Sequence, residues 1–172
     1  ATDGLRHPYA VSVGEEIRWY RHSSPPNPGF LRGVSAGYTV FAIETVADRI
    51  ARAAGRDPLE WRMAHLTDPR GRRVLEAAAA KGRWSAQDGL LRGIATMTFR
   101  RSWIATVATL SNVGGNFRIE RLDIVADVGL AIHPDLVVRQ IEGATVFGLS
   151  MATLERLSYK EGQAMIASVA DY

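Results

Sequence analysis

One stretch in the first half of the chain has a helical pattern of apolar positions. Apolar side chains recur every three or four positions between residues 37 and 54, and Asp48 and Arg52 are spaced to pair on the opposite side. The pattern predicts an amphipathic helix, and Gly55 follows at the position where glycine commonly ends a helix. The apolar positions are Phe41, Ala42, Val46, Ile50 and Ala53.

Two further helices are predicted from their start signals. In Asp57-Pro58-Leu59-Glu60 the aspartate can cap the helix, the proline suits a first turn that needs no amide donor, and Glu60 can complete a capping box. These residues predict a helix over residues 58–66. Asp68-Pro69 is a second Asp-Pro start signal and predicts a third helix over residues 69–81, ended by a glycine.

The second half of the chain begins with a pattern typical of strands. Residues 93–101 and 103–112 are rich in Ile, Thr, Val and Phe, and Gly114-Gly115-Asn116 forms a turn into a third run over residues 117–128. The three runs predict a β-meander. The apolar phase changes within the last run, so we expect a bulge near Glu120-Arg121.

A last helix and a hairpin are predicted after the meander. His133-Pro134-Asp135 opens a helix that extends to about Leu154, and a closing hairpin is expected to turn at Glu161-Gly162. The small residues in the helix would let another group approach it closely. Its predicted stripe consists of Val137, Ile141, Ala144, Gly148 and Met151.

The N-terminal region reads as strands followed by a stiff loop. Residues 7–13 and 17–21 favour short strands, whereas residues 23–29 contain three prolines and exclude both helix and central strand.

All these elements together predict an α+β protein in which a mixed or antiparallel sheet packs against helices. We expect a single domain over residues 1–172, with a loop and helical half over 1–82 and the meander, helix and hairpin over 83–172.

Composition narrows the possible functions. The chain has 172 residues, 47% of them hydrophobic and 23% charged, which excludes a disordered or low-complexity protein. It contains no cysteine, so a disulfide scaffold, a thiolate metal site and a cysteine nucleophile are excluded within these residues. A net charge of +3 without aromatic-flanked basic clusters argues against nucleic acid as a partner, and no apolar run is long enough for a membrane span.

Few residues suggest chemistry on their own. Arg32, with Gly33, follows the proline-rich loop and precedes a helix, a place where a guanidinium and free backbone amides suit an anion, although a solvated loop arginine is the alternative. Gln140 lies in an apolar, glycine-bearing helix, where its amide would need partners if buried, although it can equally lie at the surface. Asp123 and Asp127 share a strand face and could form a carboxylate pair. The four histidines have no metal-type spacing.

Several short motifs occur in a defined order along nearly the whole chain. They are Arg32-Gly33-Val34-Ser35-Ala36-Gly37, Phe41-Ala42-Ile43-Glu44-Thr45, Ala53-Ala54-Gly55-Arg56-Asp57-Pro58-Leu59-Glu60-Trp61-Arg62, Val125-Ala126-Asp127-Val128-Gly129, His133-Pro134-Asp135, Gln140-Ile141-Glu142-Gly143 and Phe147-Gly148-Leu149-Ser150. Taken together they resemble the molybdopterin-binding large subunit of the xanthine dehydrogenase and aldehyde oxidase family of molybdenum hydroxylases. The arrangement is similar to the isoquinoline 1-oxidoreductase beta-subunit type.

The resemblance implies which residues contact the cofactor. Arg32, Gly33 and Val34 would reach the pterin near molybdenum, and Gln140, with Gly143 beside it, would bind the pterin or its pyrophosphate. An anionic, ring-rich cofactor suits such cationic and amide donors. Three positions depart from the family pattern. Val34 replaces an aromatic residue, Val128 replaces a frequent cysteine, and His133 replaces an asparagine, which would remove a good helix cap.

The resemblance also implies a function for the parent protein. It would hydroxylate an N-heteroaromatic compound or an aldehyde with oxygen from water, using molybdopterin with molybdenum, expected in the cytosine dinucleotide form. Electrons would leave through iron-sulfur clusters on a separate small subunit. The bacterial cytoplasm and periplasm both remain open as its location.

We expect this chain to be a fragment of such a large subunit. The segment with the family's catalytic glutamate is absent from the sequence, so no catalytic residue is assigned, and the isolated chain is expected to be inactive and without cofactor. Its partners would be the remainder of its own subunit, the iron-sulfur subunit and the substrate. The alternative is a non-catalytic scaffold or subunit-interface module of a degenerate relative.

Overall fold

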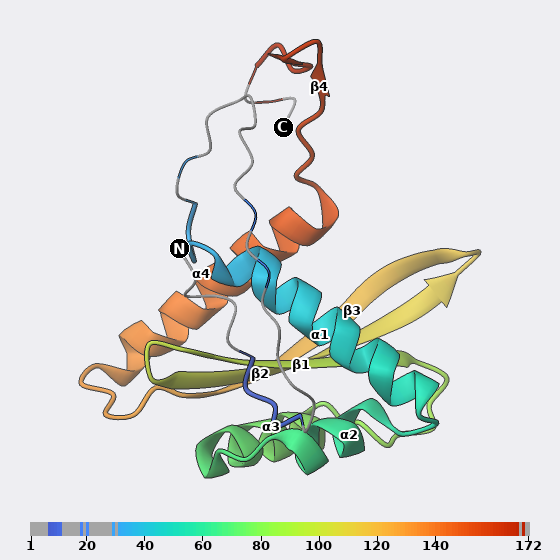
Figure 1. Cartoon of the computed structure of the whole chain (residues 1–172), viewed down its shortest axis with the longest axis vertical. Helices are drawn as coiled ribbons and strands as arrows, with labels where there is room; N and C mark the ends of the chain where they lie inside the picture. Colours follow the sequence, from blue (N-terminus) through green and yellow to red (C-terminus); the bar gives the residue numbers. More distant parts are fainter. Residues whose placement is uncertain are drawn as a thin grey trace. The chain divides into compact units, whose positions relative to one another are not determined.

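The computed structural model describes residues 7–11, 18, 20, 29, 31–168 and 170. The described elements confirm an α+β fold with an antiparallel sheet, and they form two compact units (Figure 1). Unit 1 comprises residues 1–16 and 31–129, and unit 2 comprises residues 17–30 and 130–172. In chain order the elements are α1 (Ala36–Ala53), α2 (Pro58–His65), α3 (Pro69–Lys81), β1 (Leu91–Phe99), β2 (Ser102–Val113), β3 (Asn116–Asp127), α4 (Pro134–Thr153), β4 (Tyr159–Lys160) and β5 (Gln163–Ala164).

Little of the predicted N-terminal structure lies within the described residues. Tyr9 forms an antiparallel bridge with Leu66, and the amide of Ala10 donates to the carbonyl of His65 at 2.7 Å. This contact holds residues 7–11 against the end of α2. The rest of the predicted strands over 7–13 and 17–21, apart from residues 18 and 20, and the proline-rich loop before Gly29 lie outside the described residues.

The helix starts follow the sequence signals closely. The Asp57 carboxylate accepts from the amides of Leu59 and Glu60 and caps α2, and Asp68 caps α3 in the same way. Each proline lies in the first turn, as predicted. Asp57 also accepts from the indole Nε1 of Trp84 at 3.0 Å, so the α2 cap is tied to the loop after α3.

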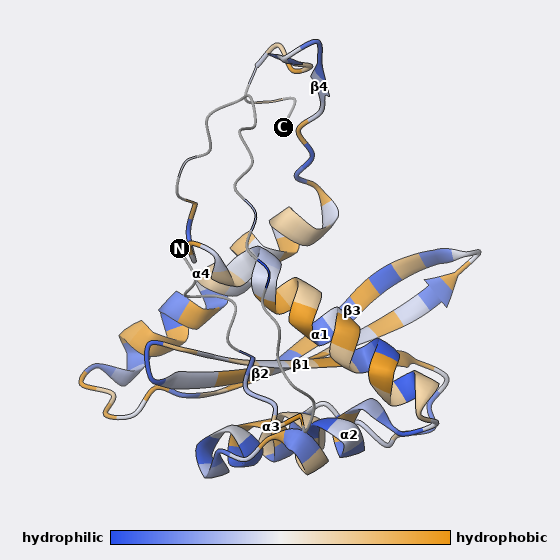
Figure 2. Ribbon diagram, in the orientation of Figure 1, coloured by the Kyte–Doolittle hydropathy of each residue, from blue (hydrophilic) through white to orange (hydrophobic). Residues whose placement is uncertain are grey.

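In α1 the apolar side faces outward. Its apolar stripe, which includes Phe41, Val46 and Ile50, is exposed, with 74%, 52% and 45% of the respective residue surfaces accessible. The buried residues of α1 are instead Thr39, Glu44, Ala47 and Ala51. Figure 2 shows hydrophobic residues lying along α1 between polar bands. Asp48 pairs with Arg62 of α2 at 2.6 Å rather than with Arg52, the partner expected from the sequence.

The sheet of unit 1 has the predicted meander topology. The strands lie in the order β1, β2, β3, all antiparallel. Thr109 opposes Arg121 and Leu110 opposes Ile119, so Glu120 is the extra residue and the predicted bulge is confirmed. Gly114 and Gly115 form the β2–β3 turn with φ values of 60° and 87°.

Helix α3 covers one face of the sheet and forms the core with it (Figure 1). Contact is close where glycine replaces a side chain. A Cβ atom at Gly82 would lie 2.5 Å from the Cβ of Val107, and one at Gly71 would lie 2.7 Å from the ring of Trp103. The buried apolar residues are Tyr9, Ala47, Ala51, Trp61, Leu66, Val74, Leu75, Ala78, Ala79, Ile94, Trp103, Ala105 and Val107.

An ion pair ties the start of α3 to the end of β3. Arg70 donates from Nε and Nη2 to the two carboxylate oxygens of Asp127 at 2.9 and 2.7 Å, and from Nη1 to the carbonyl of Arg101 at 3.0 Å. The Asp127 carboxylate also accepts from the amide of Gly129. Arg70 first and then the Gly129 amide lower the pKa of Asp127 well below its usual range.

Unit 2 contains α4 and a short hairpin. The hairpin of β4 and β5 turns at Glu161 and Gly162, whose φ values of 52° and 80° suit a two-residue turn, and this confirms its predicted position. The expected loss of the α4 cap is wrong. The Nδ1 atom of His133 accepts from the amide of Leu136 at 3.2 Å, so the histidine caps the helix in place of asparagine.

Substituting Gly82 with alanine tests the packing of α3 on β2. The new methyl group would overlap the Val107 side chain, so we expect the free energy of unfolding to fall by about 1–3 kcal/mol. Gly93→Ala is the matched control, because no described atom lies within 4 Å of the added Cβ, and it should change stability by no more than about 0.5 kcal/mol. Urea denaturation of both variants provides the measurement. Equal stabilities would contradict the close contact.

The Arg70–Asp127 pair should make stability depend on pH. Because the pKa of Asp127 is lower in the folded than in the unfolded chain, the pair stabilises the fold above the unfolded value of about 4 and this contribution is lost as the pH falls. The difference in melting temperature between the wild type and Asp127→Asn should therefore be smaller at about pH 3 than at pH 7. A difference that stays constant over this range would show that the ion pair does not contribute.

Candidate cofactor-binding segments

The loop before α1 is built around a tight turn. The amide of Val34 donates to the carbonyl of Leu31 at 2.9 Å, and Gly33 has the positive φ of 85° that a type II turn requires at its third residue. Val34 also has a positive φ, 54°, which is costly for a β-branched residue. We call residues 32–35 the Arg32 loop. Its conformation exposes Arg32, Gly33 and Val34, whereas Ser35 is buried.

The first turn of α1 presents amide donors next to this loop. Thr39 is the first residue of α1 whose amide bonds within the helix, to the carbonyl of Ser35 at 3.1 Å, and no side chain caps the helix. The amides of Gly37 and Tyr38 therefore lie before the first backbone hydrogen bond within the helix. Free amides at a helix N-terminus favour an anion, because they point along the positive end of the helix dipole.

The second predicted segment lies on α4 in unit 2. Gln140 and Gly143 are both exposed, and no described atom comes within 4 Å of a Cβ built on Gly143 or Gly148. The small residues of this helix therefore leave room beside its backbone. The Gln140 amide, with one acceptor oxygen and two N–H donors, is available on the same helix.

A buried polar cluster holds the inner face of α1. The Glu44 carboxylate accepts from the Tyr9 hydroxyl at 2.6 Å, from Nε of Arg62 at 2.9 Å and from the amide of Thr96 at 3.1 Å. The Arg62 side chain is fully buried, and only 7% of the Glu44 side chain is exposed. We call Tyr9, Glu44, Asp48, Arg62 and Thr96 the Glu44 cluster.

The Arg62 guanidinium has further partners besides the Glu44 carboxylate. Arg62 also donates to the carbonyl of Pro58 at 3.1 Å and to the carbonyl of Glu44 at 3.2 Å, and it forms an ion pair with the carboxylate of Asp48. Burial first, and then the Glu44 carboxylate, raise the pKa of the Tyr9 hydroxyl well above its usual value. Tyr9 therefore remains a neutral hydrogen-bond donor to Glu44.

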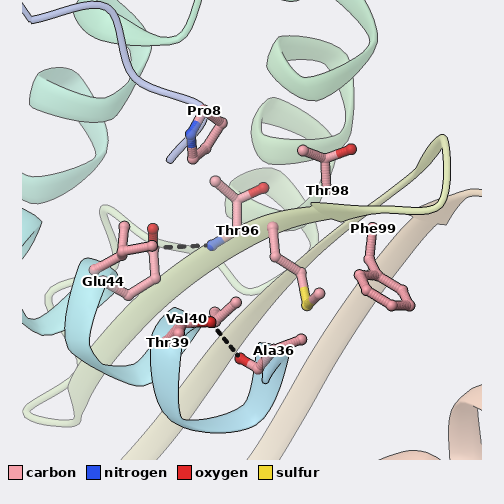
Figure 3. A pocket seen from close by; sticks show the side chains of 10 residues that line it. Pro8, Ala36, Thr39, Val40, Glu44, Thr96, Thr98 and Phe99 are labelled. Atoms are coloured by element: carbon pink, nitrogen blue, oxygen red, sulfur yellow. Dashed lines mark hydrogen bonds between the residues drawn. The ribbon is translucent and has the colours of Figure 1, made fainter. Parts of the chain in front are cut away.

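A cavity of about 30 Å³ lies beside the Glu44 cluster. Figure 3 shows Glu44 and Thr96 on its wall, with Thr39 and Ala36 of α1 nearby. This volume has room for one or two water molecules and is far too small for a pterin. This cavity is therefore not a pterin site.

The remaining candidate residues have structural roles. Asp123 pairs with Arg121 at 2.7 Å and Asp127 pairs with Arg70, so the two carboxylates do not form an acid–base pair. In the part of the chain that the structure describes, no group of three His, Asp or Glu side chains is arranged to hold a metal ion. No helix among these residues has the length and apolar character needed to cross a membrane.

Sequence reasoning missed the Glu44 cluster. Glu44 and Arg62 occur in two of the motifs, but the motifs assign neither of them a role. The available signal was a glutamate directly preceded by Phe41, Ala42 and Ile43 on a helix, with an arginine 18 positions later in a second helix. That signal indicates a possible ion pair, but it does not show that the pair is buried.

Known proteins resemble this chain over most of its length. A family model of the molybdopterin cofactor-binding domain matches residues 42–172, a region that includes Gln140 and Gly143 and begins after the Arg32 loop. The beta subunit of the isoquinoline 1-oxidoreductase of Brevundimonas diminuta is 31% identical over 151 residues, which are 83% of this chain and 19% of that protein. A subunit of the nicotinate dehydrogenase of Pseudomonas putida is 31% identical over 154 residues, which are 77% of this chain and 13% of that protein.

The chain matches only part of each of these two relatives. It spans no more than about a fifth of the length of these two relatives. No solved structure gives a significant match. The family model nevertheless covers well over half of the chain, and its match includes β1, β2, β3 and α4. The chain therefore belongs to the family of molybdopterin cofactor-binding domains found in the large subunits of molybdenum hydroxylases.

Proposed function

We propose that this chain supplies part of the wall of a molybdopterin site in a molybdenum hydroxylase large subunit. The observation that carries the proposal is the start of α1, where the exposed Arg32 loop adjoins the uncapped amides of Gly37 and Tyr38. Backbone amides and a guanidinium are the donors that a phosphate or pyrophosphate group prefers. The donor set therefore fits an anionic cofactor.

The residues of the Arg32 loop would bind and orient the cofactor. Arg32 would donate to its anionic part, Gly33 would let the cofactor approach the backbone, and the exposed Val34 side chain would contact its ring system. When bound, molybdopterin with its molybdenum supplies the redox chemistry of the parent enzyme. The dinucleotide form is favoured because its additional phosphate gives these donors more to bind.

On unit 2, Gln140 and Gly143 would contact the cofactor separately from the Arg32 loop. The Gln140 amide can both donate to and accept from a pterin edge, which carries groups of both kinds. Gly143 leaves space at the α4 backbone for a flat ring. The support for this assignment is the match of the family model, which includes both residues.

The parent enzyme is proposed to hydroxylate an N-heteroaromatic compound or an aldehyde, with electrons passing to iron-sulfur clusters on another subunit. The support is that the relatives are, by their names, parts of an isoquinoline oxidoreductase and of a nicotinate dehydrogenase. Because the chain spans only a small part of each relative, this activity is assigned to the parent and not to the isolated chain.

The exposed stripe of α1 is proposed to pack against the remainder of the same large subunit. Val46 and Ile50 line an apolar groove of about 310 Å³ together with Tyr9 and Trp61, and Phe41 is 74% exposed on the same helix. Apolar patches of this kind usually mark an interface. The rest of the subunit is the favoured occupant, because about four fifths of the length of the isoquinoline oxidoreductase relative lies outside the matched region.

The cofactor assignment predicts a loss of molybdenum and pterin in full-length subunits that carry a substitution at Arg32 or at Gln140. Arg32→Ala and, separately, Gln140→Ala should each lower cofactor content per subunit, because lost donors leave polar cofactor atoms unpaired at a cost of about 1–3 kcal/mol. Arg49→Ala and Gln87→Ala are matched controls on exposed positions, and they should leave the content unchanged. Metal analysis, pterin fluorescence and a melting curve are measured together. Full cofactor content in a normally melting variant would contradict the assignment of that residue.

The interface proposal predicts that one substitution has different effects in two contexts. Phe41→Lys should leave the melting temperature of the isolated 172-residue chain almost unchanged, because the side chain is exposed there. In the full-length subunit it should destabilise the fold, because a charge would be buried without a partner. If the isolated chain is a dimer that Phe41→Lys dissociates while the full-length subunit is unaffected, a second copy is the occupant and the proposal is wrong.

A further inference from the structure

Helix α1 is held in unit 1 mainly by polar contacts. Its buried residues are Thr39, Glu44, Ala47 and Ala51, and two alanines offer only small apolar surfaces. Its large apolar side chains face outward. The Glu44 cluster is therefore the strongest constraint on where α1 lies.

The cluster fixes both the position and the rotation of α1. Through Glu44 the helix is joined to Tyr9 in the N-terminal segment, to Arg62 on α2 and to the Thr96 amide on β1 (Figure 3 shows the last contact). Arg62 forms ion pairs with two carboxylates that lie one helical turn apart, those of Glu44 and Asp48. Contacts with three separate segments and with successive turns prevent the helix from sliding or turning about its axis.

The Arg32 loop continues directly into this helix. The amide of Ala36 donates to the carbonyl of Gly33 at 2.9 Å, and the Thr39 hydroxyl donates to the carbonyl of Ser35 at 2.7 Å. Glu44 lies eight residues after Ala36, about 12 Å along the helix axis. The positive φ of Val34 is a strained conformation that persists only when its surroundings hold it. The anchored helix provides that support from one side.

We propose that Glu44, held by Arg62, is a positioning residue for the Arg32 loop. It does not contact the cofactor but fixes the helix whose first turn carries the cofactor-binding amides. The inference rests on the proposed function of that loop. The experiment therefore measures the order of the loop and the retention of the cofactor separately.

The primary variant is Glu44→Gln, which keeps the shape of the side chain and removes its charge. Asp127→Asn is the matched control, because it makes the same change in another ion-paired carboxylate of unit 1, which pairs with Arg70. Hydrogen exchange is measured in the 172-residue chain for the amides of residues 32–38. Molybdenum and pterin content are measured in the full-length subunit carrying the same substitutions.

In Glu44→Gln, exchange in residues 32–38 should become faster by about tenfold, the order expected when a charge-assisted hydrogen bond is lost. In Asp127→Asn these amides should change by less than about twofold, even if both variants melt at similarly reduced temperatures, because distant sites act independently. Cofactor content should fall in Glu44→Gln alone. Equal exchange of the loop in the two variants would overturn the proposal, because Glu44 would then affect only global stability.

Two other results are also decisive. If the loop exchanges faster but the cofactor content is unchanged, Glu44 positions the loop as proposed, and the assignment of the loop to the cofactor is wrong. If Glu44→Gln does not fold, Tyr9→Phe takes its place, since it removes only the hydroxyl that donates to Glu44. It should then speed exchange of the same amides by a smaller factor. No acceleration in Tyr9→Phe would overturn the proposal.

Discussion

The interaction between Glu44 and Arg62 decides the arrangement of unit 1. Removing a carboxylate and a guanidinium from water is costly, and such a pair is tolerated only when further hydrogen bonds satisfy both groups. Here the Glu44 carboxylate accepts from three donors. The guanidinium donates to that carboxylate and to two carbonyl oxygens, and it forms an ion pair with Asp48. Removing one partner of a buried pair generally costs about 3–5 kcal/mol, because the other charge is then stranded.

The same interaction explains why α1 shows an apolar surface. The polar side of the helix carries Glu44 and Asp48. Their ion pairs with the buried Arg62 orient that side toward the core. Phe41, Val46 and Ile50 consequently face away from the core of unit 1. An element that buries its charges and exposes its apolar residues suits a domain that is itself one layer of a larger protein. The small share of the relatives' length that this chain covers agrees with such a setting.

The sheet and α3 provide a rigid frame for this arrangement. The close approach of Gly82 to Val107 and of Gly71 to Trp103 leaves α3 little freedom against β2. Thr96, which donates to Glu44, lies on β1 in the same sheet. The hydrogen bond of the Glu44 carboxylate to β1 therefore fixes the position of α1 relative to the packed core. The position of α1 in turn fixes where the preceding loop lies.

Local chemistry in the sequence determined where most elements begin and end. Asp57-Pro58 and Asp68-Pro69 start helices because the cap and the proline act within one turn, and the change of apolar phase located the bulge at Glu120 because strand alternation is also local. The motif order pointed to the family, and Arg32, Gly33 and Val34 lie on an exposed loop before a helix, as the sequence predicts. The sequence did not determine which side of α1 is buried. Periodicity measures only how side chains are distributed around a helix, whereas burial depends on the partners that other segments supply, and Arg62, Tyr9 and the Thr96 amide are brought to Glu44 only by the tertiary structure.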